Sequence, residues 1–396
     1  MITVEEASRI IFENLLTPAI DTRPLTEVVG CVLAENITVD RDLPPFDRVT
    51  MDGIAINFDQ WTDGRRKFAI EGTQAAGEPQ KSLVNKANCF EVMTGAMLPG
   101  GCDTVIRYED VEILDGEAIV KVNELQQGQS VHKQGVDAKT GEVVLERGQK
   151  LASSEIALLA SVGKTRVDVL RPARVAVIST GDELVAVEDT PKPWQIRRSN
   201  SYALQAALRE SGVESRSFHL EDDPEVLKAG LTDITRDFEV MILSGGVSKG
   251  RFDYVPQTLE AIGIKKLFHQ VSQRPGKPFW FGAGNGKIAF ALPGNPVSTF
   301  MCFYKYIKPW LLLSMGVEVG ETFAVLGKDF TFPPPLTFFL QVSVRNDGGR
   351  LVATPVPGGG SGDFANLKNV DGFLELPLEK GEFRSGEVFR YIPFRH

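Results

Sequence analysis

The stretch EVMILSGGVSKGRFDYVPQTLEAIG, residues 239–263, contains an apolar run, a glycine-rich turn and a helical pattern in direct succession. A short, continuous apolar run bounded by turn residues is typical of a buried strand. The last ten residues have helical spacing and end at a glycine, the residue that most often follows the end of a helix. The stretch therefore predicts one strand–helix unit of an α/β fold.

The same alternation continues on both sides of this unit. The preceding strand-like runs, each followed by a helical segment, are RVAVIST (174–180) and ESRSFHL (214–220). The following ones are PFWFG (278–282) and KIAFALPG (287–294), after which a long helix is expected from Asn295. Strands that alternate with helices of this length predict a doubly wound, mostly parallel α/β domain over residues 169–318.

Two other kinds of sequence surround this domain. Residues 41–137 consist of short β-type runs separated by glycine turns, which predicts an inserted β-rich domain. Residues 1–40 and 138–168 each contain one helical stretch and are expected to form a discontinuous linking domain, with Ser153 or Ser154 capping the second helix. Helical patterns stop near residue 320, so residues 319–396 predict a small C-terminal β domain. The expected fold is multidomain, α/β plus β.

Composition excludes several classes of function. A chain of 396 residues with 42% apolar and 24% charged residues is typical of a globular protein of two to four domains. Its net charge of −9 argues against broad nucleic-acid binding. We expect no signal peptide, because the N-terminal residues lack a basic stretch followed by an apolar one, and no membrane segment, because no apolar run approaches about 20 residues. The four scattered cysteines lack zinc-ligand spacing, and a cytoplasmic location is expected.

Polar residues follow the predicted strands, at the point where each strand ends. In open α/β sheets, ligands bind beyond the carboxyl ends of the strands. If the strands are parallel, the turns that follow them share one edge of the sheet. These turns contain Thr180, Gly181, Asp182 and Glu183; Glu221, Asp222 and Asp223; Ser244, Gly245, Gly246, Val247, Ser248 and Lys249, with Asp253 beyond; and Pro293, Gly294, Asn295 and Pro296.

The composition of this edge points to a phosphate ester bound together with a divalent cation. Backbone N–H groups of glycine-rich turns suit phosphate oxygens, as do the nearby Lys249, Arg274 and Lys277. Carboxylates such as Asp253 suit Mg²⁺, which takes one or two protein oxygens and bridges to substrate phosphates. The glycine-rich turn has neither Walker A nor dinucleotide-binding spacing. The residues alone therefore predict an α/β enzyme that acts on a phosphate ester with Mg²⁺.

Structural roles compete with functional ones at several of these positions. Asp182 could accept turn hydrogen bonds, and Asp222 or Asp223 could cap the helix expected from Pro224. We expect capping for Asp223, whereas at Glu183 and Asp253 we favour ligand binding. The segment RPGKPFW could be only a rigid turn, because its two prolines restrict the backbone.

Two stretches of the β-rich domain also present polar side chains on rigid turns. Asp52 lies in an Asp-Gly turn after two prolines, and Thr94 lies beside two glycine-rich turns. Asp-Gly turns are common in β domains, so Asp52 taken alone would be read as structural.

Six of these stretches together carry a resemblance to a known family. They are PPFDRVTMDGIA (44–55), MTGAMLPGGCDTVIRYED (93–110), STGDEL (179–184), LSGGVSKGRFDYV (243–255), PGKPFWFG (275–282) and ALPGNPVS (291–298). In this order they resemble the molybdopterin molybdenumtransferases, the MoeA family, which includes the enzymatic domain of gephyrin. The resemblance covers nearly the whole chain and implies the same four domains, the α/β one being MogA-like.

The resemblance implies a reaction in molybdenum cofactor biosynthesis. Such transferases take adenylated molybdopterin and molybdate as substrates, insert the metal at the dithiolene and release AMP, with Mg²⁺ present. It also implies a homodimer whose site is completed across the subunit interface, with the upstream molybdopterin adenylyltransferase as a candidate partner. No nucleic acid and no membrane is expected to bind.

Carried over by motif, the resemblance assigns roles to individual residues. The catalytic set implied is Asp52, Thr94, Glu183, Asp253 and Lys277. Metal binding is implied for Glu183, Asp222 and Asp253. Binding of the pterin substrate is implied for Asp137, Thr180, Gly181, Ser244, Gly245, Gly246, Ser248, Arg274, Gly276, Pro293, Gly294, Asn295 and Pro296. Lys277 and Arg274 would neutralise phosphate or molybdate, and the two prolines would shape a rigid wall.

Three positions depart from the usual motifs, and three alternatives stay open. Ile54 stands for a tyrosine, Val136 for a glutamate and Arg274 for a lysine; arginine binds oxyanions as a fork rather than as a point charge. These changes leave room for a paralogue that prefers tungstate. A molybdopterin adenylyltransferase would generally consist of the α/β domain alone. A non-catalytic scaffold is the third alternative, although nothing in this sequence resembles the extra domain and linker of the gephyrin branch.

Overall fold

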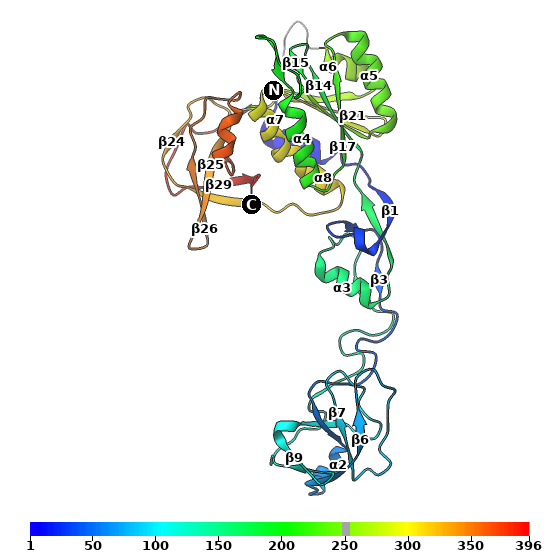
Figure 1. Ribbon diagram of the computed structural model, residues 1–396. Coiled ribbons are helices and arrows are strands. Elements are labelled where there is room, and N and C mark those ends of the chain that lie inside the picture. Colours follow the sequence, from blue (N-terminus) through cyan, green and yellow to red (C-terminus); the bar gives the residue numbers. More distant parts are fainter. Residues whose placement is uncertain (248–253, 396) are drawn as a thin grey trace. The chain divides into compact units, whose positions relative to one another are not determined.

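The computed structural model describes residues 1–247 and 254–395, and the chain divides into two compact units (Figure 1). The first unit comprises Met1–Thr22, Gly30–Ala34 and Asp168–His396, and the second comprises Arg23–Val29 and Glu35–Val167. Each unit has its own buried apolar clusters, so each is held together by its own core.

A six-stranded sheet forms the centre of the first unit. Its order is β17 (Ser215–Leu220), β14 (Val175–Thr180), β18 (Val240–Ser244), β22 (Lys287–Leu292), β21 (Trp280–Gly284) and β19 (Lys265–His269). The first four strands are parallel and the last two pair antiparallel. All six side chains of β14 are buried, as expected of a strand with helices on both faces.

Alternate residues of β14 pack against different helices. Val175 and Val177 belong to the cluster that includes apolar residues of α4 (Ser199–Glu210) and α7 (Pro296–Cys302). Ala176 and Ile178 belong to the cluster that includes α5 (Pro224–Asp237) and α6 (Val255–Ala261). Helices on both faces of a mostly parallel sheet confirm the doubly wound α/β fold. Asp223 caps α5, as expected, by accepting hydrogen bonds from the amides of Glu225 and Val226.

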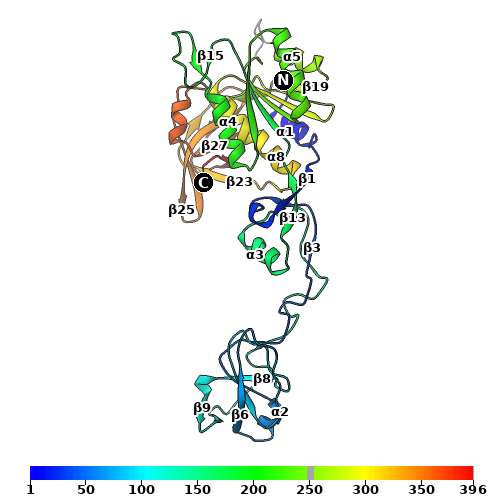
Figure 2. The ribbon, with the colours of Figure 1, turned by 45° about the vertical axis from the view of Figure 1, so that its right-hand side comes forward.

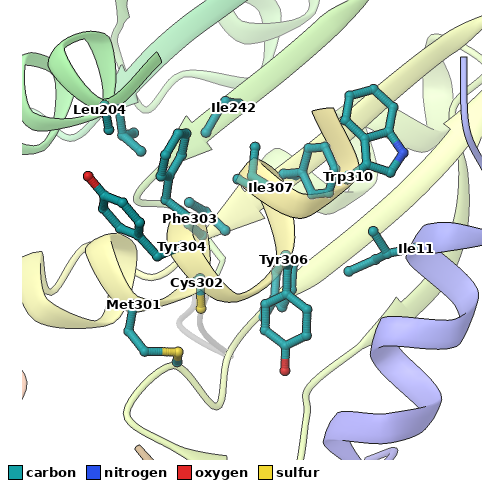
Figure 3. Packing of buried hydrophobic residues seen from close by; sticks show 14 of the residues in the cluster. Ile11, Leu204, Ile242, Met301, Cys302, Phe303, Tyr304, Tyr306, Ile307 and Trp310 are labelled. Atoms are coloured by element: carbon teal, nitrogen blue, oxygen red, sulfur yellow. The ribbon is translucent and has the colours of Figure 1, made fainter. Parts of the chain in front are cut away.

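The long helix expected from Asn295 is present, with one irregular turn. It consists of α7, a π-helical turn η3 (Phe303–Ile307) and α8 (Lys308–Ser314). Pro309 lacks the N–H that would bond to the carbonyl of Lys305, and its ring would clash with that carbonyl. The wider π turn ends at Ile307, two residues before this proline. Buried aromatic side chains of this segment pack beside α1 (Val4–Phe12), which begins with the Thr3–Glu6 capping box (Figure 3).

The C-terminal segment folds as a small closed barrel in the same unit (Figure 2). Its strands, in order, are β25 (Thr337–Asp347), β26 (Arg350–Pro355), β23 (Thr322–Leu326), β29 (Val388–Pro393) and β27 (Gly372–Leu376), and β27 pairs again with β25. A short strand from the α/β domain, β20 (Gln273–Arg274), joins this sheet beside β25. This pairing brings Arg274 next to the barrel.

The second unit contains the β-rich domain and one helix of the linking segment. Its main sheet has the order β8 (Thr104–Arg107), β5 (Gly53–Ile56), β7 (Cys89–Val92), β6 (Lys67–Gln74), β10 (Glu117–Val120) and β9 (Val111–Leu114). The helix is α3 (Ser153–Ser161), and its N-cap is Ala152 rather than Ser153 or Ser154. The expected cap was wrong because the Glu155 carboxylate accepts from the Ala152 amide, 2.8 Å away, which starts the helix one residue earlier.

Short strands outside these sheets pair in small ladders. A three-stranded ladder has the order β1 (Ala19–Pro24), β13 (Arg166–Arg171) and β2 (Val32–Leu33), and a two-stranded one joins β15 (Leu184–Val185) to β16 (Ile196–Arg197). In the described part of the chain, no helix has the length and apolar character needed to cross a membrane.

Candidate functional site

The turns after the parallel strands meet around one cavity of about 620 Å³. The register explains why, because Ser179 of β14 pairs with Ser244 of β18, and Ser244 pairs with Leu292 of β22. Strands that end level with one another place their following turns side by side. Of the residues expected at this edge, those that line the cavity are Thr180, Gly181, Glu183, Asp222, Ser244, Gly245, Gly246, Pro293, Gly294, Asn295 and Pro296.

The glycine-rich turn after β18 lies close above the end of β14. Gly245 has φ +104°, and a Cβ atom there would lie 2.7 Å from the carbonyl oxygen of Thr180. Only glycine allows both this backbone conformation and this approach. The hydroxyl of Thr180 is buried beneath the turn and has no hydrogen-bond partner among the described residues. The amide of Gly245 donates to the carbonyl of Leu292, 3.2 Å away, so the turn is also held at the end of β22.

Asn200 fixes two of these turns relative to each other. Its side-chain amide donates hydrogen bonds to the hydroxyl of Ser244, 2.7 Å away, and to the carbonyl of Gly294, 2.8 Å away. Asn200 lies in the first turn of α4, so the helix carries its amide to the ends of β18 and β22. The sequence placed Asn200 at a helix start but did not predict this role. Its location after a strand of the same edge was the available signal.

Two arginines at the cavity were also missed by the sequence analysis. Arg197 and Arg198 line it from the segment that precedes α4. Their cations offer charge to an anionic ligand, which the acidic turns do not. The adjacent Arg-Arg pair directly before a predicted helix at this edge was the signal that could have found them.

His219, at the end of β17, is kept neutral beside this cavity. Its Nδ1 lies 3.0 Å from the hydroxyl of Ser179. Burial lowers the pKa of His219, and the nearby cation of Arg198 lowers it further. Because a neutral imidazole carries no charge, the positive charge near this cavity comes from Arg197 and Arg198 rather than from His219.

Two of the three expected metal-binding carboxylates line the same cavity, namely Glu183 and Asp222. Asp253, the third, and Ser248 lie outside the described residues. Asp182 accepts a hydrogen bond of 3.3 Å from the amide of Asp222, which links the turn after β14 to the turn after β17. No group of three or more potential metal-binding side chains occurs within residues 1–247 and 254–395.

A second cavity, of about 530 Å³, adjoins the first between the α/β domain and the barrel. Arg274, Gly276 and Lys277 line it, as does a row of apolar barrel residues. Both cavities share Pro278, Pro293 and Asn295 as lining residues. Pro278 and Pro293 thus form part of the wall where the two cavities meet.

A buried hydrogen-bond network holds the turn that carries Arg274 and Lys277. The side-chain nitrogen Nε2 of Gln273 donates to the carbonyl of Gly276, 3.0 Å away. Its side-chain oxygen Oε1 accepts from the hydroxyl of Tyr306, 2.5 Å away. Gln273 and Tyr306 are both completely buried. Figure 3 shows Met301, Cys302 and Tyr306 projecting from their helix on one side. The sequence did not predict this network.

Asp52 and Thr94 form a pair within the β-rich domain of the second unit. One carboxylate oxygen of Asp52 accepts from both the amide and the hydroxyl of Thr94, at 2.6 and 2.7 Å. These bonds, the backbone one first, lower the pKa of Asp52. In the same unit, Asp137 lies 2.9 Å from Nε2 of His132. Both carboxylates are exposed, so each remains accessible to a ligand.

Three family models match consecutive parts of the chain. They are described as the MoeA N-terminal region (domain I and II), over residues 2–163; a probable molybdopterin binding domain, over residues 176–312; and the MoeA C-terminal region (domain IV), over residues 323–394.

Relatives of known name and structure match over almost the full length. The molybdopterin molybdenumtransferase of Synechocystis sp. is 40% identical, covering 99% of each chain. The protein of the same name from Bacillus subtilis is 31% identical, covering 92% of this chain and 87% of its own. A crystal structure of a molybdopterin biosynthesis MoeA protein from Pyrococcus horikoshii is 32% identical with a TM-score of 0.87 and covers 100% of both chains.

The doubly wound domain and the inserted and C-terminal β domains define a multidomain protein of the molybdopterin-binding class. The chain belongs to the MoeA family of molybdopterin molybdenumtransferases. This confirms the family indicated by the six motifs and makes the protein a transferase of molybdenum cofactor biosynthesis.

Proposed function

We propose that this protein inserts molybdate into adenylated molybdopterin and releases AMP in a Mg²⁺-dependent reaction. The observation that carries the proposal is one cavity at the ends of the parallel strands, where glycine-rich turns, two carboxylates and two arginines meet. Backbone amides and cations suit the phosphates of the substrate, and carboxylates suit a divalent cation. Membership of the MoeA family indicates that this substrate contains a pterin.

Arg274 and Lys277 would bind the anionic substrate from the adjoining cavity. Both side chains are exposed, on a turn that a buried network keeps rigid, so they reach solvent from a fixed base. Cleavage of the phosphoanhydride requires an oxygen nucleophile at phosphorus and leaves AMP as a negatively charged product. Preorganised cations stabilise charge that develops during such a step. Pro293 and Pro296 would shape the rigid wall.

The residues present fit a magnesium ion. Glu183 and Asp222 line one cavity, and Mg²⁺ is commonly held by one or two carboxylates together with substrate phosphates and water. Asp253 would add a third carboxylate. The ion would supply charge neutralisation at the phosphoanhydride. Glu183 and Asp222 would hold it, while the glycine-rich turn would keep the phosphates in place.

Asp52, Thr94 and Asp137 would take part from the β-rich domain, and the functional form would be a homodimer. The two hydrogen bonds that Asp52 accepts from Thr94 favour an ionised, oriented carboxylate, which a binding role requires. The upstream adenylyltransferase is the partner proposed to supply the adenylated substrate. A cytoplasmic location is proposed with these partners.

Arg274 makes a preference for tungstate the first alternative to test. Tungstate and molybdate are both tetrahedral oxyanions, and a guanidinium fork binds such an anion with defined geometry. Adenylyl transfer and a purely scaffolding role are the remaining alternatives. Neither would give AMP release that depends on molybdate.

The test measures AMP release from adenylated molybdopterin with and without molybdate, tungstate and Mg²⁺. The wild-type protein should release AMP only when an oxyanion and Mg²⁺ are both present. Glu183→Gln should abolish most of this release. Glu188→Gln, which changes an exposed carboxylate outside the cavity lining, should release AMP as the wild type does. AMP release at the same rate with and without molybdate or tungstate would overturn the proposal.

A further inference from the structure

The barrel presents a stack of phenylalanine rings to the second cavity. Phe330, Phe332 and Phe338 all line this cavity. Phe338 lies between the other two, with ring centroids 4.2 Å from Phe332 and 5.6 Å from Phe330. The interplanar angles are 16° and 4°, so the three rings are nearly parallel. Phe330 and Phe338 are only partly buried, so part of the stack faces the cavity rather than the barrel core.

Cations lie beside this aromatic wall. The guanidinium of Arg274 lies 5.9 Å from the ring centroid of Phe332, within cation–π distance. Lys277 lines the same cavity. An aromatic face bordered by cations suits a flat ring that carries a negatively charged group, because the ring stacks while the charge is neutralised.

The cavity adjoins the one at the strand ends. Pro278, Pro293 and Asn295 line both, and the Asn295 side chain is tied to Ser361 of the barrel segment by a hydrogen bond of 3.0 Å. A ligand of two parts can therefore extend from the polar cavity to the apolar one. The polar part would lie among the glycine-rich turns and the flat part against the phenylalanines.

We propose that the wall of Phe330, Phe332 and Phe338 is the binding site for the nitrogen heterocycle of the substrate, with its phosphates at the strand ends. The proposal deepens the proposed function and rests on it only for the choice of ligand. Adenylated molybdopterin carries two such heterocycles, adenine and the pterin, each of which contains a planar pyrimidine ring and is linked to phosphate. The barrel thereby contributes ring recognition to a site whose phosphate chemistry belongs to the α/β domain.

The test compares three ligands by isothermal titration calorimetry, namely AMP, 6-hydroxymethylpterin monophosphate and ribose 5-phosphate, which has no ring system to stack. At least one of the first two should bind more tightly than ribose 5-phosphate. Phe338→Leu keeps apolar volume but removes the aromatic face, and should weaken that ligand about 5- to 100-fold while leaving ribose 5-phosphate unchanged. Phe330→Leu should act in the same direction.

Phe323→Leu is the matched control, because Phe323 lies in the same barrel, is 51% exposed and lines neither cavity. It should bind all three ligands as the wild type does, and thermal melts should show all variants folded. If Phe338→Leu weakens the binding of AMP alone, the wall binds adenine. If it weakens the binding of the pterin phosphate alone, the wall binds the pterin. Equal binding of all three ligands by wild type and Phe338→Leu would overturn the proposal.

The outcomes separate this proposal from the proposed function. Ring binding that depends on Phe338, in a protein that releases no AMP with molybdate, would leave the aromatic site standing and remove the reaction. Molybdate-dependent AMP release with ring binding unaffected by Phe338→Leu would do the opposite.

Discussion

The hydroxyl of Tyr306 donates a hydrogen bond of 2.5 Å to the side-chain oxygen of Gln273, and this bond joins the π-helical turn to the loop that carries Arg274 and Lys277. Both side chains are completely buried. The side-chain nitrogen of Gln273 also donates a hydrogen bond to the carbonyl of Gly276, so this carbonyl is held in place as well. Lys277 lies one residue beyond that carbonyl. The position of an exposed cation is thus set by groups that never touch solvent.

Removing the Tyr306 hydroxyl should loosen this loop. Tyr306→Phe leaves the oxygen of Gln273 buried without a donor, which costs about 1–3 kcal/mol of unfolding free energy. Because the loop presents the cations, the KM for molybdate should rise more than kcat falls. Denaturant unfolding and steady-state kinetics check the two effects. Tyr202→Phe, at a position 54% exposed, is the control and should change neither. Unchanged stability in Tyr306→Phe would contradict the buried network.

A methyl group at Gly276 should be far more damaging than one at Gly286. Both glycines have positive φ, +91° and +70°, so alanine strains the backbone at each position. A Cβ at Gly276 would also lie 2.7 Å from the amide nitrogen of Gln273 and 2.8 Å from Sγ of Cys302, whereas Gly286 has open space. Gly286→Ala should cost about 1–2 kcal/mol, the left-handed backbone penalty. Gly276→Ala should cost clearly more in thermal unfolding and reduce activity. Equal losses would show that crowding is unimportant.

Substitutions of Lys305 and Glu375, which form a buried ion pair, should have non-additive effects on the unfolding free energy. The two groups join the π-helical turn to β27, with Nζ 2.7 Å from the carboxylate, and their side chains are only 3% and 17% exposed. Burial lowers the pKa of Lys305, while the Glu375 carboxylate opposes that shift. Lys305→Met alone should therefore cost about 3 kcal/mol, because it leaves a mostly buried carboxylate unpaired. The double variant Lys305→Met/Glu375→Leu should recover most of this loss. Simple addition of the two single losses in a denaturant double-mutant cycle would argue against coupling.

His219 should make the protein less stable as pH falls. Burial, and after it Arg198, lowers its folded-state pKa. The backbone of Ser179 opposes this lowering only partly, as do Asp182 and Glu221. The unfolded imidazole takes up a proton near its ordinary pKa of about 6.5. The stabilising contribution is therefore complete above about pH 6.5 and is lost as pH falls through the lower folded-state pKa. Unfolding free energies should decrease more for wild type than for His219→Gln between about pH 7 and about pH 5.5. Parallel pH curves would contradict the neutral imidazole.

Much of the fold followed from local sequence patterns. Continuous apolar runs such as VAVIS and MIL, each followed by a turn and a helical segment, predicted the buried strands and their shared edge. The cavity lining at that edge followed because parallel strands must place their ends together. Asp223 as a helix cap was also predictable, since the cap and its helix are adjacent in sequence.

Contacts between distant segments were not predictable in this way. Gln273 and Tyr306 are 33 residues apart, and nothing in either neighbourhood encodes their pairing. Asn200 bonds to Gly294 across 94 residues, so its role depends on two strands ending level with each other. The aromatic wall likewise depends on how β25 closes the barrel next to β20. Such contacts are set by tertiary packing, which local periodicity does not report.

The measurement that tests the central claim most directly is a product balance in a single reaction. Purified protein would be incubated with adenylated molybdopterin, Mg²⁺ and molybdate, and both AMP and molybdenum-loaded molybdopterin would be quantified over time. We predict that the two products form in equal amounts and that neither forms when molybdate is omitted and no tungstate is added. AMP formation without molybdenum-loaded product, or no product at all from folded protein, would contradict the assignment of this cavity to metal insertion.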